Sequence, residues 1–280
     1  MKIAYGTYAM PDVVLEEAIP ALADIGYDGI EICVGNRHED AMPANVDATR
    51  REDLRGLLTG ENMGVPALFL LGSLYTDDAA QHQATLEHLK ACAALGRDLG
   101  MARPVLAMGF GGPRQDWEKG RGRLVDLLGE VAQVAQAENF IFAGEAHAGA
   151  MIDRSERIIS VLDAVGSPFV RFHFDIVHLF LAGEVISEAV ARLVPYTAHT
   201  HITDAIRKPE GGFQLVLLGQ GDLDAVGYLR AMQVAGWDSY ITLEVSTMVW
   251  GQEGYDWRAA AQESYEAISG AFATAGAARG

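Results

Sequence analysis

A closed (β/α)8 barrel is the fold class that this sequence predicts, and three observations indicate it. Eight short β-rich runs alternate with helical segments along 280 residues, an alternation typical of βα units in a parallel sheet. The spacing is roughly 35 residues per unit, which is usual for a barrel of eight units. The first run is followed by Gly6-Thr-Tyr-Ala-Met-Pro11, which lacks the glycine-rich phosphate loop expected of a doubly wound open sheet.

The eight predicted strands are short runs rich in β-branched, aliphatic or aromatic residues. They are Lys2–Gly6, Gly29–Cys33, Val65–Leu70, Val105–Gly109, Phe140–Glu145, Val170–Asp175, Thr197–Thr203 and Tyr240–Glu244. No linker or change in composition interrupts the series. We therefore expect residues 1–280 to form a single (β/α)8 barrel domain.

The helices between these strands are predicted from apolar periodicity and from glycine or proline stop signals. The first begins at Pro11-Asp12, and the others are Arg51–Leu58, Asp78–Leu99, Arg123–Ala137, Ser155–Val165, Glu184–Leu193, Asp222–Val234 and Gly254–Ala273. One connection departs from the alternation, because Arg207–Gly221 contains Gly211-Gly212 between apolar and charged residues. We expect it to form a turn or hairpin over the strand ends.

Composition and charge narrow the class of protein. The formal net charge of −17 argues against a nucleic-acid partner, because phosphate binding depends on lysine and arginine. No unbroken apolar run of about 18 residues indicates a membrane span, and the N-terminal sequence lacks the long apolar core of a signal peptide. Cys33 and Cys92 are too few for a disulfide framework. We therefore expect a cytoplasmic protein without membrane or nucleic-acid partners.

The stretch from Phe169 to Arg207 contains two β-rich runs that end in residues able to bind a metal. These runs are Arg171–His178 and Thr197–Asp204. Side chains alternate faces along a strand, so His199 and His201 share one face. A lone buried histidine is more often a hydrogen-bonded core residue, and we expect His173 and His199 to be of that kind. A cluster of such residues with carboxylates at other strand ends instead favours an active site.

Four residues fall at the C-terminal ends of predicted strands, where the active sites of barrel enzymes lie. They are Glu145, Asp175, His201 and Glu244. Three carboxylates and one imidazole form a hard ligand set that suits Mn²⁺, Mg²⁺ or Co²⁺, with Zn²⁺ as an alternative. A metal between the glutamates would polarise a carbonyl and stabilise the adjacent enediolate, while each glutamate could move one proton. We therefore predict proton transfer beside a carbonyl, as in keto-sugar isomerisation or epimerisation.

With these residues in this order, the chain resembles the sugar-phosphate isomerase/epimerase-like family of xylose isomerase-like TIM barrels. Its members include ketose 3-epimerases, inosose isomerases, inosose dehydratases and hydroxypyruvate isomerases, and the resemblance covers nearly the whole chain. It implies a divalent metal, with Mn²⁺ expected first, and Glu145 and Glu244 as acid/base groups. The metal ligands that it implies are Glu145, Asp175, His201 and Glu244.

The same resemblance implies residues that bind substrate oxygens. The family's Asp-x-x-His after strand six matches Asp175-Ile-Val-His178, and its arginine beyond the strand-seven histidine matches Arg207. Glu31, toward the end of the second predicted strand, and His147, which shares a face with Glu145 if the fifth strand continues, are further candidates for substrate contact. The aromatic residues Tyr8, Phe69, Phe110 and Trp250 follow strand ends and are candidates for an apolar wall. Ketose 3-epimerases carry a carboxylate where this chain has Met151, and the ligand spacing is nearer to that of inosose isomerases.

The first interpretation is thus a metal-dependent isomerase or epimerase of a keto-sugar, inosose or similar polyol ketone. Because members of the family it resembles are often dimers or tetramers, we also expect a homo-oligomer. The alternative is a lyase on the same scaffold, an inosose dehydratase or C-glycoside-cleaving enzyme, because the first proton abstraction is shared. A DNA-repair endonuclease of the endonuclease IV type is rejected, because the third and fourth strands end in Phe69-Leu70 and Met108-Gly109 instead of histidines. A non-catalytic sugar-binding barrel is disfavoured by the full ligand set.

Overall fold

The fold is a closed barrel of parallel strands, seen in a computed structural model that describes residues 1–112 and 116–280. The strands follow one another around the barrel in the order β1-β10-β7-β6-β5-β4-β3-β2. Their bounds are β1 Lys2–Gly6, β2 Gly29–Val34, β3 Leu68–Ser73, β4 Val105–Gly109, β5 Ile141–Glu145, β6 Val170–Asp175, β7 Thr197–Ile202 and β10 Tyr240–Leu243. The predicted fold class is confirmed, and β3 begins at Leu68 rather than at Val65.

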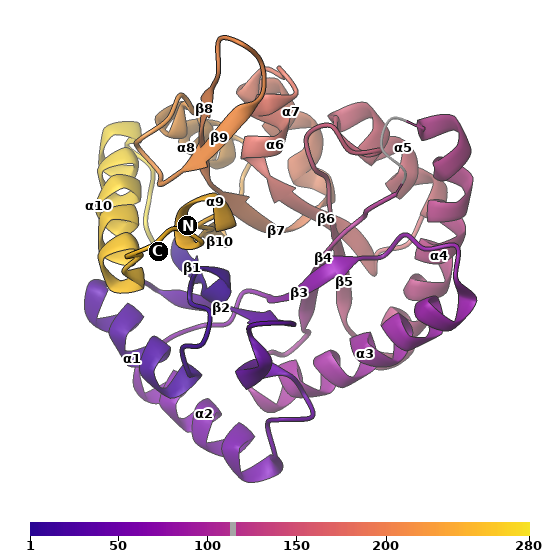
Figure 1. Ribbon diagram of the computed structural model, residues 1–280, viewed down its shortest axis with the longest axis horizontal. Helices are drawn as coiled ribbons and strands as arrows, with labels where there is room; N and C mark the ends of the chain where they lie inside the picture. The colour runs from indigo at the N-terminus through magenta and orange to yellow at the C-terminus, as the bar shows by residue number, and fades with distance from the viewer. Residues whose placement is uncertain (113–115) are drawn as a thin grey trace.

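Helices form a ring around the outside of the barrel (Figure 1). The longer ones are α1 Leu15–Ile25, α2 Ala48–Gly60, α3 Ala79–Asp98, α4 Trp117–Glu138, α5 Ser155–Val165, α7 Ile186–Leu193, α8 Ala225–Val234 and α10 Trp257–Ala275. Aspartate side chains cap several of them, as Asp47 does by accepting a hydrogen bond from the Arg50 amide. No helix in the described part of the chain has the length and apolar character needed to cross a membrane.

Short helical segments at the strand ends were not predicted. They are η1 Thr7–Ala9 after β1, η2 Glu39–Ala41 after β2, α6 Ile176–Leu181 after β6, η3 Val194–Tyr196 before β7, and α9 Thr247–Trp250 after β10. Segments of three to six residues are too short for a periodic pattern to show in the sequence. Two of them begin at a side-chain cap, because Asp175 accepts from the Val177 amide and Ser246 from the Met248 amide.

The interior of the barrel combines small apolar residues with buried polar ones. A cluster of Cys33, Ala67, Phe69, Ala107 and Ala143 packs inside, separate from the larger core between strands and helices. Alanine side chains fill little of this interior. Buried polar side chains share it, namely Glu31, His173, His199 and His201.

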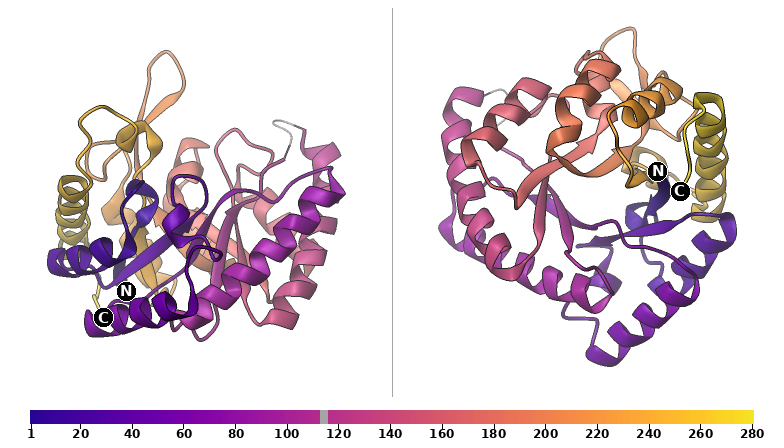
Figure 2. Two further views of the ribbon diagram at one scale, coloured as in Figure 1. Left: turned by 60° about the horizontal axis from the view of Figure 1, so that its bottom comes forward. Right: turned by 180° about the vertical axis from the view of Figure 1, so that it is seen from behind.

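The predicted hairpin is present as two antiparallel strands, β8 (Asp204–Arg207) and β9 (Phe213–Val216). It projects away from the barrel in the left view of Figure 2. Gly211 and Gly212 form its turn with positive φ angles of 99° and 80°, which glycine adopts without steric cost. The Asp204 carboxylate holds its base by accepting hydrogen bonds from the amides of Gly219, Gly221 and Leu223.

Candidate active site

The four predicted metal ligands come together at one end of the barrel. Glu145 and Asp175 end β5 and β6, His201 lies near the end of β7, and Glu244 directly follows β10. The register of the sheet places Asp175 directly opposite His201. One ligand atom from each of the four lies within 4.8 Å of the others. The structure thus brings together the four residues that the sequence singled out.

Two atoms of this group are buried and have no hydrogen-bond partner among the described residues. They are Oδ2 of Asp175 and Nδ1 of His201, the latter 3.6 Å from Oε2 of Glu244. Buried polar atoms are normally satisfied, so two unpartnered ligand atoms within a cluster of carboxylates are suited to a cation. Three carboxylates and one imidazole are ligands for a hard or borderline divalent ion. The residues present therefore fit a divalent metal.

The closeness of the buried carboxylates raises the pKa of two of them. Burial raises the pKa of Glu145 well above its usual range, and the negative charge of Glu244 raises it further. Burial and the charge of Glu244 likewise raise the pKa of Asp175 to about 7. A bound cation would favour the ionised form of each carboxylate, so metal binding and proton release are coupled at this group.

Glu31 lies inside the barrel against two histidines and is fully buried. Its Oε2 is 2.8 Å from Nε2 of His201 and 2.5 Å from Nε2 of His199. Burial by itself raises the pKa of Glu31, but attraction to His201 and the two hydrogen bonds outweigh it and lower this pKa to about 2. An ionised Glu31 accepts the Nε2–H of His201 and leaves Nδ1 of the same ring available to a metal. These contacts are with histidines, and the expected contact with substrate stays a prediction. Glu145, Asp175, His201 and Glu244 are called the metal group below.

His147 and His178 flank the acidic group. Nε2 of His147 is 3.3 Å from Oε2 of Glu145, and Nε2 of His178 is 3.5 Å from Oδ2 of Asp175. Their rings lie 4.6 Å apart. Burial lowers the pKa of His178 well below its usual range, and partial desolvation lowers that of His147, although 46% of its side chain is exposed. Both rings are therefore neutral near pH 7, and each can donate or accept a hydrogen bond. Their predicted role as substrate contacts is untested, but both lie beside the predicted ligands.

Arg207 lies on β8 of the hairpin and is exposed. Its guanidinium is 4.1 Å from the centroid of the Phe180 ring and donates to the Phe180 carbonyl oxygen. Phe180 belongs to α6, the helix that also carries His178. The guanidinium therefore lies against α6 in this conformation, and its predicted contact with substrate stays a prediction.

An aromatic wall extends from the metal group. The Phe69 ring lies edge-on to His201, with centroids 5.2 Å apart. The Tyr8 ring contacts Phe69 and Trp250 at centroid distances of 5.8 Å and 5.5 Å. Burial raises the pKa of Tyr8 to about 12, and the nearby charge of Glu244 adds to it. This wall, defined as Phe69, Tyr8 and Trp250, gives one side of the site an apolar surface.

Some residues near this wall were not found from the sequence. Arg37 follows β2, and its guanidinium lies 4.9 Å from the Trp250 ring centroid. His38 stacks on Tyr8 at a centroid distance of 5.9 Å. Neither belongs to a strand end or a spaced motif, so no sequence signal marked them. Phe110, expected in the wall, is instead buried in the core against Gly144.

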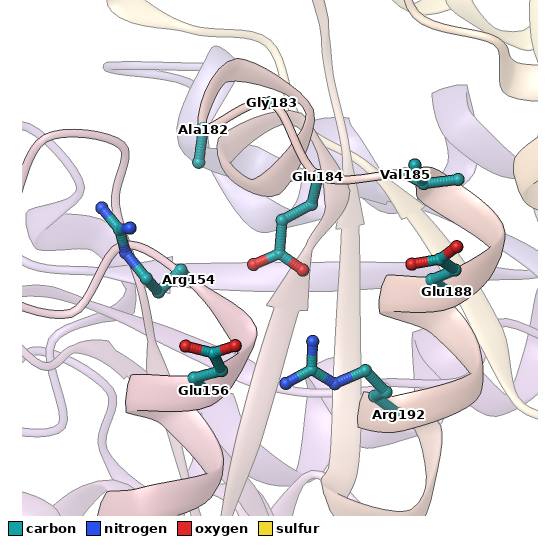
Figure 3. A pocket seen from close by; sticks show the side chains of 8 residues that line it. All are labelled: Arg154, Glu156, Ala182, Gly183, Glu184, Val185, Glu188 and Arg192. Atoms are coloured by element: carbon teal, nitrogen blue, oxygen red, sulfur yellow. The ribbon is translucent and has the colours of Figure 1, made fainter.

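Figure 3 shows a cavity of ≈ 320 Å³ between the beginning of α5 and the segment that joins α6 to α7. It is lined by Arg154, Glu156, Ala182, Gly183, Glu184, Val185, Glu188 and Arg192. The Glu184 carboxylate accepts hydrogen bonds from the amide and hydroxyl of Ser155, the first residue of α5. Glu184 thereby stabilises the beginning of α5, and none of the four predicted metal ligands lines this cavity.

The family model described as "Xylose isomerase-like TIM barrel" matches residues 19–269. The chain belongs to this family. Curated relatives of this xylose isomerase-like protein include the fructoselysine 3-epimerase of Escherichia coli O157:H7, 22% identical over 265 residues, which cover 89% of this chain and 91% of the relative. The inosose dehydratase of Clostridium perfringens (strain 13 / Type A) is 21% identical over 275 residues, covering 86% and 87%.

Solved structures confirm the xylose isomerase-like fold. The IOLI protein, whose structure has a bound zinc atom, superposes with a TM-score of 0.79 at 20% identity and covers 98% of each chain. An L-ribulose 3-epimerase superposes with a TM-score of 0.77 at 21% identity, covering 98% of this chain and 95% of the other. At these identities the likeness establishes the fold, and the chemistry has to be argued from the residues of this site.

Proposed function

We propose that this xylose isomerase-like protein is a divalent-metal-dependent isomerase or epimerase of a keto-sugar, an inosose or a similar small polyol ketone. The observation that carries the proposal is the convergence of Glu145, Asp175, His201 and Glu244, whose ligand atoms lie within 4.8 Å of one another. Relatives named as a fructoselysine 3-epimerase and an inosose dehydratase support a substrate of the sugar class.

The metal would be held by the four residues of this group. A divalent ion there would polarise the substrate carbonyl and lower the energy of the adjacent enediolate. Mn²⁺ is expected because three of the four ligands are carboxylates, while the zinc bound in the IOLI structure supports Zn²⁺ as the alternative.

The proton chemistry is assigned to Glu145 and Glu244. They extend from β5 and β10, which are separated by β6 and β7 around the barrel, so they approach a substrate from different sides. One carboxylate takes the proton from the carbon beside the ketone, and the other returns a proton to the opposite face or to the neighbouring carbon.

His147 and His178 are assigned to substrate oxygens. Their neutral rings lie beside Glu145 and Asp175, within reach of a ligand placed at the same group. A neutral imidazole donates through one nitrogen and accepts through the other, so it can bind a hydroxyl of a polyol. Together they would fix which carbon of the substrate faces the acid/base pair.

Deuterium exchange tests the proposal. Protein loaded with Mn²⁺ is incubated in D₂O with a panel of ketoses and inososes, and products are analysed by NMR. The proposal predicts deuterium on the carbon beside the ketone, and no exchange after chelation of the metal. Turnover without any incorporation would instead indicate a hydride shift between carbons, with the glutamates acting as ligands only.

A lyase is the second candidate. The curated relatives include an inosose dehydratase, and the solved structures with the same fold include a probable 3-DHS dehydratase from Bacillus anthracis. The same first proton abstraction could be followed by loss of a β-hydroxyl or glycosyl group. Mass spectrometry of the same reactions separates the two functions, since a lyase product loses water or a sugar and an isomerase product keeps the mass of its substrate.

A further inference from the structure

Arg37 occupies an unusual backbone position beside the aromatic wall. Its φ angle is 67°, in the left-handed region that residues other than glycine rarely adopt. Asp12, in the loop after η1, has a φ of 65°, and its amide donates to the Arg37 carbonyl at 3.3 Å. Strained backbone of this kind concentrates at ligand-binding loops. Two loops at the barrel end thus hold Arg37 in a defined position.

The guanidinium of Arg37 has no polar partner in the described part of the chain. It lies over the Trp250 ring and forms no ion pair there, whereas Arg50 in α2 binds both Glu16 and Asp40. Arg37 is exposed, so all five of its N–H donors are available to a ligand. Stacking on Trp250 orders the side chain without using those donors.

The aromatic wall links Arg37 to the metal group. Centroid distances of 5.2, 5.8 and 5.5 Å lead from His201 through Phe69 and Tyr8 to Trp250. A substrate with its ketone at the metal group can extend along these rings, because a sugar presents apolar C–H faces. The guanidinium, 4.9 Å from the Trp250 centroid, lies at the end of this wall remote from His201.

The positive charge of Arg37 stands out against the negative charge of the rest of the chain. The chain carries a net charge of −17, which repels anions unless a local cation receives them. A cavity of ≈ 320 Å³ opens beside Arg37, lined also by Asp12, Val13, Asn36, His38, Glu39 and Asp40. Three carboxylates line it as well, Asp12, Glu39 and Asp40, of which Asp40 is paired with Arg50 at 2.7 Å. Arg37 is the charged residue of this cavity that lies over the wall.

We propose that Arg37 binds an anionic group, a carboxylate or a phosphate, at the end of the substrate remote from its ketone. The proposal rests on the function argued above, since it places the ketone at the metal group. Arg37 is then a specificity-determining residue, because it contacts the part of the substrate that distinguishes one ketone from another and leaves the reacting carbons to Glu145 and Glu244.

A series of fructose derivatives that differ only at C6 tests the proposal. Binding to the Mn²⁺-loaded protein is measured by calorimetry for D-fructose, D-fructuronate, D-fructose 6-phosphate and 6-amino-6-deoxy-D-fructose. We expect one or both anions to bind about 10–100-fold more tightly than D-fructose, the range for a hydrogen bond to a charged group, and the ammonium compound to bind no more tightly. The stronger of the carboxylate and the phosphate identifies the group.

Two variants and a control separate the contact from general effects of charge. Arg37→Ala should remove the preference for the anion and leave D-fructose binding within about twofold, as expected for an exposed side chain. Arg37→Lys keeps the charge and should retain part of the preference. Arg55→Ala removes another exposed arginine, in α2 and lining a different cavity, and should leave the preference intact.

Three results would overturn the proposal. The wild type could bind D-fructose and both anions equally tightly, it could bind the ammonium compound more tightly than D-fructose, or Arg37→Ala could lose affinity for all four compounds by the same factor. Deuterium exchange in the same samples keeps the two claims separate. Exchange on D-fructose with no preference for anions contradicts only the role of Arg37. An anion preference that depends on Arg37, without exchange on any probe or on the wider ketose panel, contradicts only the proposed function.

Discussion

The two ring nitrogens of His201 have different neighbours, and this difference gives Glu31 a role that can be tested. Nε2 is 2.8 Å from the Glu31 carboxylate, while Nδ1 has no partner and belongs to the metal group. Loss of a partner that orients a ligand typically lowers metal affinity by about 10–100-fold. We expect Glu31→Gln to do so, as measured by Mn²⁺ titration. Wild-type affinity in a folded Glu31→Gln protein would show that His201 needs no partner.

The acid/base assignment predicts a loss of rate without a matching loss of metal. Glutamine keeps an oxygen ligand but cannot exchange a proton, so Glu145→Gln and Glu244→Gln should each lower kcat by about 10²–10⁴-fold. Elemental analysis of the same samples checks that metal is retained. If either variant keeps its wild-type kcat, that glutamate serves as a ligand alone.

The sequence indicated the four candidate ligands because each one lies at a predictable place. Glu145 and Asp175 end β-rich runs, and parallel strands of a barrel bring such ends to one face. The bond between Glu31 and His199 could not be found in this way, because both residues lie within their strands, β2 and β7, and not at the strand ends. Arg37 was missed because its contact with Trp250 depends on how two loops fold together.

At the scale of elements, the β8–β9 hairpin positions Arg207 beside α6. Its guanidinium now stacks on Phe180, and a change of side-chain rotamer could turn it toward a substrate. If it binds substrate oxygens, Arg207→Ala should lower kcat/KM by about 10–100-fold, with metal content unchanged because Arg207 is not a ligand. Lys208→Ala, an exposed neighbour, is the matched control. A kcat/KM within about twofold of wild type would exclude Arg207 from the site.

Some helix and strand boundaries were predicted correctly and others were not, and the missed elements are mostly the shortest ones. β1, β4 and β6 have the bounds expected from the sequence, because clear turn or helix signals flank them. α6 and α9 were missed, since their beginnings depend on single caps at Asp175 and Ser246 rather than on a repeated apolar pattern. α4 begins at Trp117 instead of Arg123.

At the scale of the whole molecule, protons and metal compete for the same group. Burial and Glu244 raise the pKa of Asp175 to about 7, from an ordinary value of about 3.9 in unfolded chains. The folded metal-free protein therefore binds more protons than the unfolded chain between these values. This contribution to stability is fully present below about pH 4 and is lost as the pH rises through about 7.

Metal should reverse that loss, because the ion binds the ionised carboxylate. We expect the increase in Tm caused by Mn²⁺ to be small near pH 5 and to grow as the pH rises through about 7, the pKa of Asp175. Thermal scans with and without the metal across this range measure it. If Mn²⁺ raised the Tm by the same amount near pH 5 and above pH 7, Asp175 would not be a ligand.

The central claim is that four strand-end residues hold a metal ion, and the metal content of purified protein tests it most directly. After loading with Mn²⁺ and removal of free metal, elemental analysis should find about one ion per chain in the wild type, as expected if Glu145, Asp175, His201 and Glu244 share one ion. His201→Ala should lose most of it, while His88→Ala, on α3 and outside the group, should keep it. Full occupancy in His201→Ala, or no bound metal in the wild type, would contradict the account.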